Sequence, residues 1–538
     1  MIAETRRWTN WLLAFVIAVA VGGGYFMHQL GIAATAVGAA AALCWFCSNE
    51  HNLRWYAATI GLLLPQDVIV ARLSIADVCA SPAIFRTGLD GLRRRTLPHS
   101  TMIAPFCLLT ATFVIATIVE YRTLGHVTSW TLFNKDTGLI LQVLVFAALA
   151  ATLTTPVDVR HLVRWFVAGV VISNIAALFG VAAAFSGIPN PLYNVGNHRL
   201  FGWMANPSVT GALLMTGAFL QVSLLASKPA SIGAMRSFEW AGLGLLGGSL
   251  ALTLSRGTWL AVACGAGALL VLLIVERARH APWPQSVVVA TVLWWAVPSI
   301  ALGALAWQAA PLRAMASVGG RAAALRSDLV GKCQSDPTLD VCREVVMTNA
   351  ERARTTPPHA LDPVPPPVAV STPASVASTS ELTSVPPPNP LFVPDPRDGA
   401  LRNARGLTDR LAITRSAFRR YNQSVTTRLF GIGLGTFYET SAGEFGVPLI
   451  IHNTFVWFLV ELGPLGLVAV LWVWAQTGMN LWRVFRSDDG DRKMAAGLIA
   501  TFVAMTVFCV FNEGFYQRSL WIVIALADRL RATSDGAA

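Results

Sequence analysis

Three basic residues, Arg199, Arg256 and His452, have the side chains needed to handle a phosphate group and a proton. The planar guanidinium of arginine pairs bidentately with phosphate oxygens and holds that charge strongly where the dielectric constant is low. The imidazole of histidine has an unperturbed pKa of about 6.5, which suits a general base near neutral pH. Together they predict a site where Arg199 and Arg256 bind a pyrophosphate and His452 accepts a proton.

Each of these residues also has a structural interpretation, which the sequence leaves open. A histidine at the start of a helix often caps the helix or lies at a membrane interface, and an arginine at a helix end can extend toward the headgroups. Asn206, which precedes Pro207, is a reasonable helix cap. The chemical interpretation is favoured if the three basic residues share one side of a membrane, which depends on the elements that carry them.

The composition is that of an all-α, polytopic integral membrane protein. Of the 538 residues, 54% are hydrophobic and 13% are charged, and the mean hydropathy is +0.56, whereas a soluble protein has about 25% charged residues. The net charge of +11 then reports orientation through cations in short loops, and not binding of nucleic acid. Apolar runs long enough to cross about 30 Å of hydrocarbon predict about twelve transmembrane helices, at residues 8–27, 30–48, 101–119, 137–155, 160–185, 208–227, 237–254, 257–275, 286–309, 452–476, 493–511 and 514–532.

The cations of the short loops predict how these helices are oriented. With twelve spans and an inside N-terminus, the inner loops hold most of the loop lysines and arginines, as the positive-inside rule requires. Counting residues 53–71 as a further crossing would invert every later loop, so 53–100 are expected to be a cytoplasmic or interfacial segment. Both termini are then cytoplasmic, and Arg199, Arg256 and His452 share the outer side.

One long polar segment divides the spans into two groups. Residues 1–309 hold the first nine spans, 310–450 form an outer loop domain that is mainly helical, and 451–538 hold the last three spans. Within the loop, residues 355–397 are rich in proline, serine and threonine, which predicts a poorly ordered linker.

The outer loop also carries a basic helix and two cysteines. Arg410 and Arg415 lie in a stretch whose apolar residues fall roughly on one face. Such a helix is either amphipathic with a solvated basic face or a lid over an anionic ligand or lipid headgroups. Cys333 and Cys342 predict a disulfide if the loop lies outside the cytoplasm, with a zinc site as the rival interpretation.

The helix that follows His452 carries Glu461 within its apolar run. Glu461 is about 13 Å further along a helix, too far to be the direct partner of the imidazole. We expect it to make a structural ion pair or hydrogen bond, and Glu513, beside another span, also needs a partner. Pro464 should kink the helix.

Glycines alternate in the stretch Phe430-Gly-Ile-Gly-Leu-Gly-Thr-Phe437. This spacing is similar to that of a phosphate loop, but no strand or nucleotide-binding fold surrounds it. We expect a flexible, outward-facing turn in which Gly433 is among the residues whose amides approach a ligand. The outer side has no aspartate-rich or histidine cluster, so neither a metal nor another cofactor is expected.

In their order along the chain, these motifs resemble the O-antigen ligase and polymerase superfamily. The resemblance rests on four segments: Arg199 with Gly202 and Asn206-Pro207, Ser255-Arg256-Gly257, the alternating glycines before Phe437, and His452-Asn453 with Glu461-x-Gly463-x-x-Gly466. It covers nearly the whole chain, and the long proline-rich insertion departs from the family pattern. Members are metal-independent, lipid-linked-sugar glycosyltransferases of the bacterial inner membrane with a GT-C-like fold.

The resemblance implies a specific reaction on the periplasmic side. The donor would be O-antigen linked to undecaprenyl pyrophosphate, the acceptor a sugar hydroxyl of lipid A-core, and membrane lipids the surroundings. Arg199 and Arg256 would bind the pyrophosphate, and His452 would deprotonate the acceptor for an inverting displacement. A repeat-unit polymerase and a protein O-oligosaccharyltransferase use the same donor and stay open as alternatives, as does a lipid-linked glycan transporter or flippase outside the enzyme class.

Overall fold

The computed structural model describes rather more than half of the chain and shows it to be α-helical. Two short antiparallel ladders are the exceptions among the described residues: β1 (Val68–Val70) pairs with β2 (Leu73–Ser74), and β3 (Tyr193–Asn194) pairs with β4 (Arg199–Leu200). The described residues are 68–70, 73–74, 100–153, 155–186, 192–194, 199–202, 206–227, 234–279, 407–445, 448–487 and 491–534.

Six helices of the described residues are long and apolar enough to cross a membrane, so the protein is a multi-pass membrane protein by helix length and hydropathy. They are α5 (Ile103–Leu124), α7 (Pro156–Phe185), α8 (Pro207–Ser227), α10 (Arg256–Arg279), α19 (Thr454–Arg486) and α20 (Arg492–Phe511). The other helices are shorter or less apolar: η1, a π-helix (Thr131–Asp136), α6 (Thr137–Thr152), α9 (Ala234–Leu252), α16 (Leu407–Tyr421), α17 (Val425–Phe430), α18 (Thr436–Phe445) and α21 (Arg518–Ser534).

These helices confirm part of the expected membrane topology. The six coincide with six of the twelve predicted spans. The predicted spans 137–155 and 237–254 correspond to shorter apolar helices, and the predicted span 514–532 overlaps α21. The predicted spans 8–27, 30–48 and 286–309 lie outside the described residues, as do Cys333, Cys342 and the proline-rich linker 355–397. Of the segment 53–100, the structure describes the β1–β2 ladder and Ser100.

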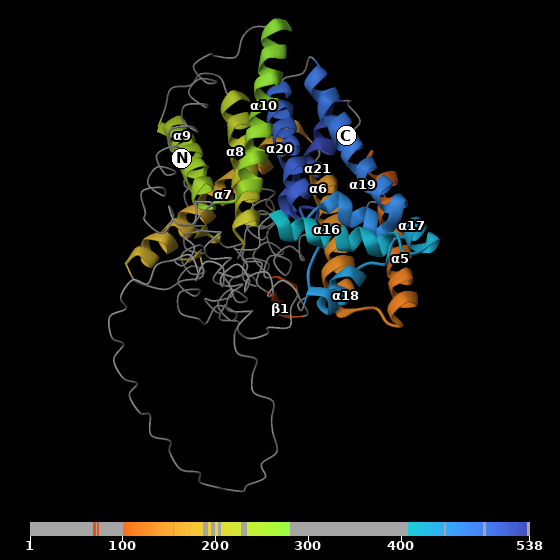
Figure 1. The fold of residues 1–538 in the computed structure, drawn as a ribbon. Coiled ribbons are helices and arrows are strands. Elements are labelled where there is room, and N and C mark those ends of the chain that lie inside the picture. Colours follow the sequence, from red (N-terminus) through yellow and green to blue (C-terminus); the bar gives the residue numbers. More distant parts are fainter. Residues whose placement is uncertain are drawn as a thin grey trace, which may run out of the picture. The chain divides into compact units, whose positions relative to one another are not determined.

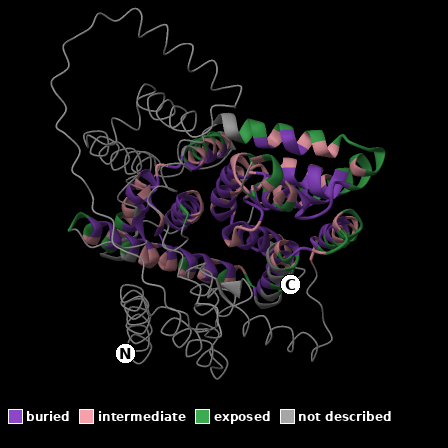
Figure 2. Cartoon of the chain, turned by 60° about the horizontal axis from the view of Figure 1, so that its bottom comes forward, coloured by how far each residue is buried: buried purple, intermediate pink, exposed green. Residues whose placement is uncertain are grey.

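Helix α20 lies in the middle of its neighbours and packs against α8, α10, α19 and α21 (Figure 1). Small residues allow this close approach. A Cβ on Gly265 of α10 would lie 2.8 Å from the Ala500 carbonyl oxygen, and one on Gly497 of α20 would lie 2.7 Å from the Ser223 Cβ of α8. Figure 2 shows the consequence: buried residues fill the inner helices, and exposed ones gather on the peripheral helices.

Helix α19 consists of two pieces separated by a break at Gly463, which has φ 77° and ψ −176°. This conformation is almost restricted to glycine, and Pro464, which lacks an N–H, follows directly. The predicted kink is therefore confirmed. The piece from Pro464 to Arg486 is about 34 Å long at 1.5 Å per residue, enough to cross the hydrocarbon core by itself.

The alternating glycines fill the break in α19. The N–H of Ile432 donates to the Val460 carbonyl (2.8 Å), which has no helical donor because residue 464 is proline, and the N–H of Gly433 donates to the Glu461 carbonyl (3.2 Å). Residues 431–437 are all buried. The expectation of a flexible, outward-facing turn is therefore wrong, because these amides bind carbonyls that the break leaves without a partner.

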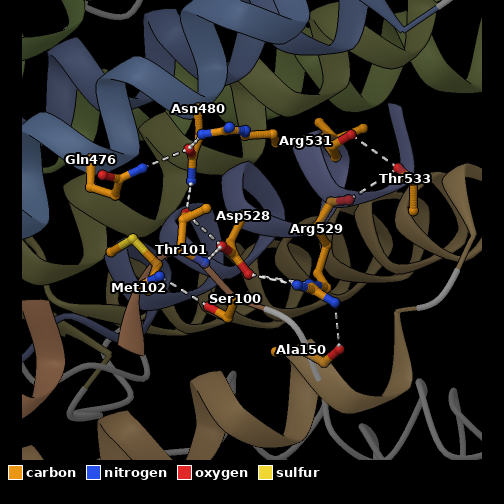
Figure 3. Close-up of polar contacts among 11 residues, drawn as sticks. Ser100, Thr101, Met102, Ala150, Gln476, Asn480, Asp528, Arg529, Arg531 and Thr533 are labelled. Atoms are coloured by element: carbon orange, nitrogen blue, oxygen red, sulfur yellow. Dashed lines mark hydrogen bonds and ion pairs between the residues drawn. The ribbon is translucent and has the colours of Figure 1, made fainter. Parts of the chain in front are cut away.

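A buried polar network joins several helices at the end that lies far from His452 (Figure 3). Asp528 of α21 accepts hydrogen bonds from the N–H and hydroxyl of Thr101 (3.1 and 3.0 Å) and pairs with Arg529 (2.9 Å). Arg529 also donates to the Ala150 carbonyl (3.2 Å), and Asn480 of α19 donates to the Thr101 hydroxyl (2.8 Å). The network ties α21, α19, α6 and the start of α5 together at the end far from His452.

Candidate functional site

Arg199 lies against the connection that leads into α10. Its Nε donates to the Thr253 carbonyl (3.1 Å) and its Nη2 to the Leu254 carbonyl (3.4 Å). Leu254 has a left-handed φ of 50°, which turns the chain sharply between α9 and α10. Arg256 follows as the first residue of α10, and its side chain lies outside the described part of the structure. The Arg199 side chain thus lies against the backbone just before Arg256, although 57 residues separate the two arginines in sequence.

The turn between α20 and α21 joins the start of α10 to the start of α19. A Cβ on Gly257 would lie 3.2 Å from the Asn512 Nδ2 atom, so α10 begins against this turn. The Thr454 hydroxyl, at the first residue of α19, donates to the Asn512 carbonyl (3.0 Å) and accepts from the Gly514 N–H (2.9 Å). These contacts fix the position of the residues just before α19.

His452 is half-buried and lies two residues before α19. Burial, with the positive charge of Arg410 as the smaller cause, lowers the pKa of His452 to about 4. The imidazole is therefore neutral near pH 7 and has a nitrogen that can accept a proton, although as a weaker base than an ordinary histidine. The next residue, Asn453, caps the helix through its Oδ1, which accepts from the Val456 N–H (3.0 Å), so capping is the role of Asn453 and not of His452.

The expected trio therefore lies at one end of the helices. Arg199 contacts the connection before Arg256, the start of α10 contacts Asn512, and Asn512 contacts the first residue of α19, next to His452. A neutral base and two arginines at one end of the helices suit the removal of a proton near a negatively charged leaving group.

The two arginines expected on a basic helix have different surroundings. Arg410, near the start of α16, donates to the Phe511 carbonyl (2.8 Å) and lies close enough to His452 to act on its charge. Burial lowers the pKa of Arg410. Arg415 is exposed on the same helix and lies away from these contacts. The apolar residue Leu411 is 46% exposed, whereas Ile413 is buried, so the covered face of the helix begins at Ile413.

Glu444 and Thr440 of α18 fasten that helix to α16, and Thr440 does so by accepting hydrogen bonds from Arg420. Glu444 pairs with Arg419 (2.5 Å) and Arg420 (3.2 Å) and accepts from the Ser416 hydroxyl. The Ser416 hydrogen bond and the two arginines hold the pKa of Glu444 below its usual value. Helix α16 is thus held at both ends, by Arg410 on the turn after α20 and by Glu444 on α18.

The sequence reasoning missed Lys135, which is buried at the same end of the molecule. Its Nζ pairs with Glu513 in the turn after α20 and lies 4.2 Å from the centroid of the Trp457 ring. The indole of Trp457 donates to Glu461 Oε2 (2.6 Å), as does the Gly435 N–H (2.9 Å). Glu461 is therefore a hydrogen-bonded structural residue, as expected, and Lys135 is the missing partner of Glu513.

The remaining expected residues have local roles. Asn206 caps α8 by accepting from the Ser208 N–H (2.8 Å), which confirms its structural interpretation. Gly202 has φ 57° and lies against Thr210 of the same helix. Among the described residues, no three His, Cys, Asp or Glu side chains are grouped so that they could hold a metal. Cys107, Cys264 and Cys509, all in described helices, are free thiols.

No protein-family model matches the chain, and no curated protein sequence is significantly similar to it.

Proposed function

We propose that the protein is a glycosyltransferase that moves O-antigen polysaccharide from undecaprenyl pyrophosphate to a sugar hydroxyl of lipid A-core. The observation that supports this proposal is that Arg199, the start of α10 at Arg256, and His452 before α19 lie at the same end of a membrane helix bundle. That end would face the periplasm of a bacterial inner membrane, since the arginines and lysines of the predicted inner loops belong to the opposite end.

The proposed step is a direct, inverting displacement. His452 takes the proton from the acceptor hydroxyl while its oxygen attacks the anomeric carbon of the first donor sugar. The bond from that carbon to the pyrophosphate oxygen breaks, and the pyrophosphate leaves with the electron pair. Arg199 and Arg256 stabilise the charge on the leaving group, so the step needs no metal, and GT-C-like enzymes with lipid-linked donors would be its relatives.

Two features of the site favour an enzyme over a transporter or flippase. The titratable groups of the candidate site lie at one end of the helices, where His452 precedes α19, and not at mid-membrane. Helix α16 is also fastened at both of its ends over that site. The polymerase and the protein O-oligosaccharyltransferase share the donor and the proposed step, and only the acceptor differs.

Complementation of a bacterial strain that lacks its O-antigen ligase tests the proposal. The wild-type chain should restore the long-chain ladder of lipopolysaccharide on a gel, whereas His452→Ala should leave undecaprenyl-linked polymer unattached. The matched control is His126→Ala, because His126 is an exposed histidine after α5 whose ring contacts only the Leu124 carbonyl among the described residues. Full activity of His452→Ala, at equal protein level, would exclude the proposed base.

The same strains separate the alternatives by product. Longer undecaprenyl-linked chains without attachment to lipid A-core would indicate a polymerase, and glycan on protein would indicate the protein-directed transferase. Translocated donor with no new glycosidic bond would indicate the flippase.

A further inference from the structure

Helix α17 exposes three large apolar side chains. It has six residues, none of them buried, and Val425, Leu429 and Phe430 are 71%, 57% and 47% exposed. We call these three side chains the α17 surface. Ser424 caps the helix and closes a capping box with Thr427, so the segment is a defined helix and not a frayed loop.

The level of α17 along the spans is fixed by the glycines that follow it. A Cβ on Gly431 would lie 2.7 Å from the N atom of Gly463, where the membrane-crossing piece of α19 begins. The N–H of Leu434 donates to the Ala116 carbonyl (3.2 Å), which lies in the second half of α5. If the piece of α19 from Pro464 to Arg486 spans the hydrocarbon core, α17 lies where that core meets the headgroups.

Exposed apolar residues of two spans continue the α17 surface. Helix α17 packs against α19 and α5. Near the contact, α5 exposes Ile118 and Tyr121, and α19 exposes Leu465 and Val468, each 45–58% exposed. On membrane-spanning helices such residues face lipid, so lipid is the occupant that can cover the spans and the α17 surface together.

The cations beside the α17 surface are only partly neutralised. Helices α16 and α17 carry five arginines, at positions 410, 415, 419, 420 and 428, and one carboxylate, Asp409. Glu444 of α18 pairs with two of these arginines, Arg419 and Arg420. Among the described residues, Arg415 has no ion-pair partner, and Arg428 donates only to the Asn422 carbonyl (3.1 Å). Two guanidinium groups are thus available at headgroup level.

We propose that α16 and α17 form an interfacial anchor whose occupant is anionic phospholipid of the surrounding bilayer. The α17 surface inserts among the acyl chains, and Arg415 and Arg428 bind headgroup phosphates. The anchor is independent of the proposed glycosyl transfer, because neither arginine contacts His452 or the turn after α20. It would hold α16, and with it Arg410, at a constant height above the bilayer.

Hydrogen exchange of the full-length protein in lipid nanodiscs tests the anchor. One disc contains phosphatidylcholine alone, and the other contains phosphatidylcholine mixed with phosphatidylglycerol. The amides of residues 425–430 should exchange about tenfold more slowly in the mixed disc, because each cation near an anionic surface adds to the binding. High salt should remove this difference by screening.

Three variants of the full chain separate charge from insertion. Arg415→Gln with Arg428→Gln should abolish the effect of phosphatidylglycerol and keep the exchange rate seen in phosphatidylcholine. The triple variant Val425→Ser, Leu429→Ser, Phe430→Ser should speed exchange in both discs. Arg486→Gln, at the far end of α19, is the control and should leave the effect intact.

Two results would overturn the anchor. One is a wild-type exchange rate that phosphatidylglycerol and salt do not change, a test that needs no variant. The other is an equal effect of phosphatidylglycerol in the double arginine variant.

Discussion

Replacing Gly431 by alanine tests how the break in α19 is closed. Gly431 has φ 79° and ψ 178°, a combination that costs a residue with a Cβ about 1–3 kcal/mol. The new Cβ would also overlap the Glu461 carbonyl oxygen and lie 2.5 Å from its carbon and 2.7 Å from the Gly463 N. All three atoms are backbone, so the loop must move away from α19.

The magnitude follows from the contacts that this movement breaks. The Ile432 and Gly433 amides lose their bonds to carbonyls of α19, at about 1 kcal/mol each. With the backbone strain, the free energy of unfolding should fall by about 3–5 kcal/mol. A 1 kcal/mol loss lowers the melting temperature by about 2 °C in a large domain, so we expect a fall on the order of 5–10 °C.

A thiol-reactive dye measures this melting in purified protein in which the exposed Cys107 is replaced by serine, because Cys509 is buried and becomes reactive when α20 unfolds. Gly443→Ala is the matched control. Gly443 lies in α18, where a Cβ would meet no atom within 4 Å, and alanine in a helix gains about 1 kcal/mol over glycine. If Gly431→Ala melts with Gly443→Ala or above the wild type, the glycine loop does not close the break in the way described.

Three further outcomes follow from the charged residues. Arg410→Gln should move the acid limb of the pH–rate profile to higher pH. Removing this positive charge raises the pKa of His452 from about 4. The base of the variant is then protonated in a window below about pH 6.5 where the wild type stays active. Lys135→Met should lower stability by about 3–5 kcal/mol by leaving Glu513 unpaired, and the double variant with Glu513→Gln should lose less than the sum in a thermal double-mutant cycle. Asp528→Asn should cost a similar 3–5 kcal/mol in thermal melting, because the guanidinium beside it stays buried.

The lowered pKa of His452 also predicts how the stability of the protein changes with pH. A depressed histidine pKa means that the unfolded chain binds more protons between about 4 and 6.5 than the folded chain does. The contribution of His452 to the free energy of unfolding is therefore fully present above about pH 6.5 and is lost as the pH falls toward 4. Melting temperatures of wild type and His452→Gln should converge or cross across that window.

Periodicity and hydropathy predicted the helices well because a membrane span must satisfy its own backbone hydrogen bonds. The kink at Pro464 and the cap at Asn206 were equally predictable, since each depends on one residue and its neighbours. Span 514–532 was the least accurate. Helix α21 carries Asp528 and Arg529 inside its buried face, where tertiary contacts with Thr101 and the Ala150 carbonyl accommodate them.

The features that could not be predicted from the sequence depend on contacts between residues that are far apart in the chain. The alternating glycines looked like a ligand loop, because the sequence does not show that residues near Val460 would need hydrogen-bond donors from residues near Gly433. Lys135 looked like an isolated loop cation before an apolar run. Its role becomes visible only when Glu513, 378 residues later, lies beside it.

The break at Gly463 separates the height of the histidine from the thickness of the bilayer. A span about 34 Å long in a hydrocarbon core of about 30 Å accommodates the hydrophobic mismatch by tilting, typically by about 20°. If α19 were continuous, its first nine residues would act as a lever of about 13 Å and displace His452 sideways by about 4–5 Å at that tilt. The first piece is held instead by the glycine loop and the turn after α20, so the piece after Gly463 can tilt in a thinner or thicker membrane without moving it. The position of the imidazole is thereby uncoupled from the tilt that a change in bilayer thickness imposes on the span.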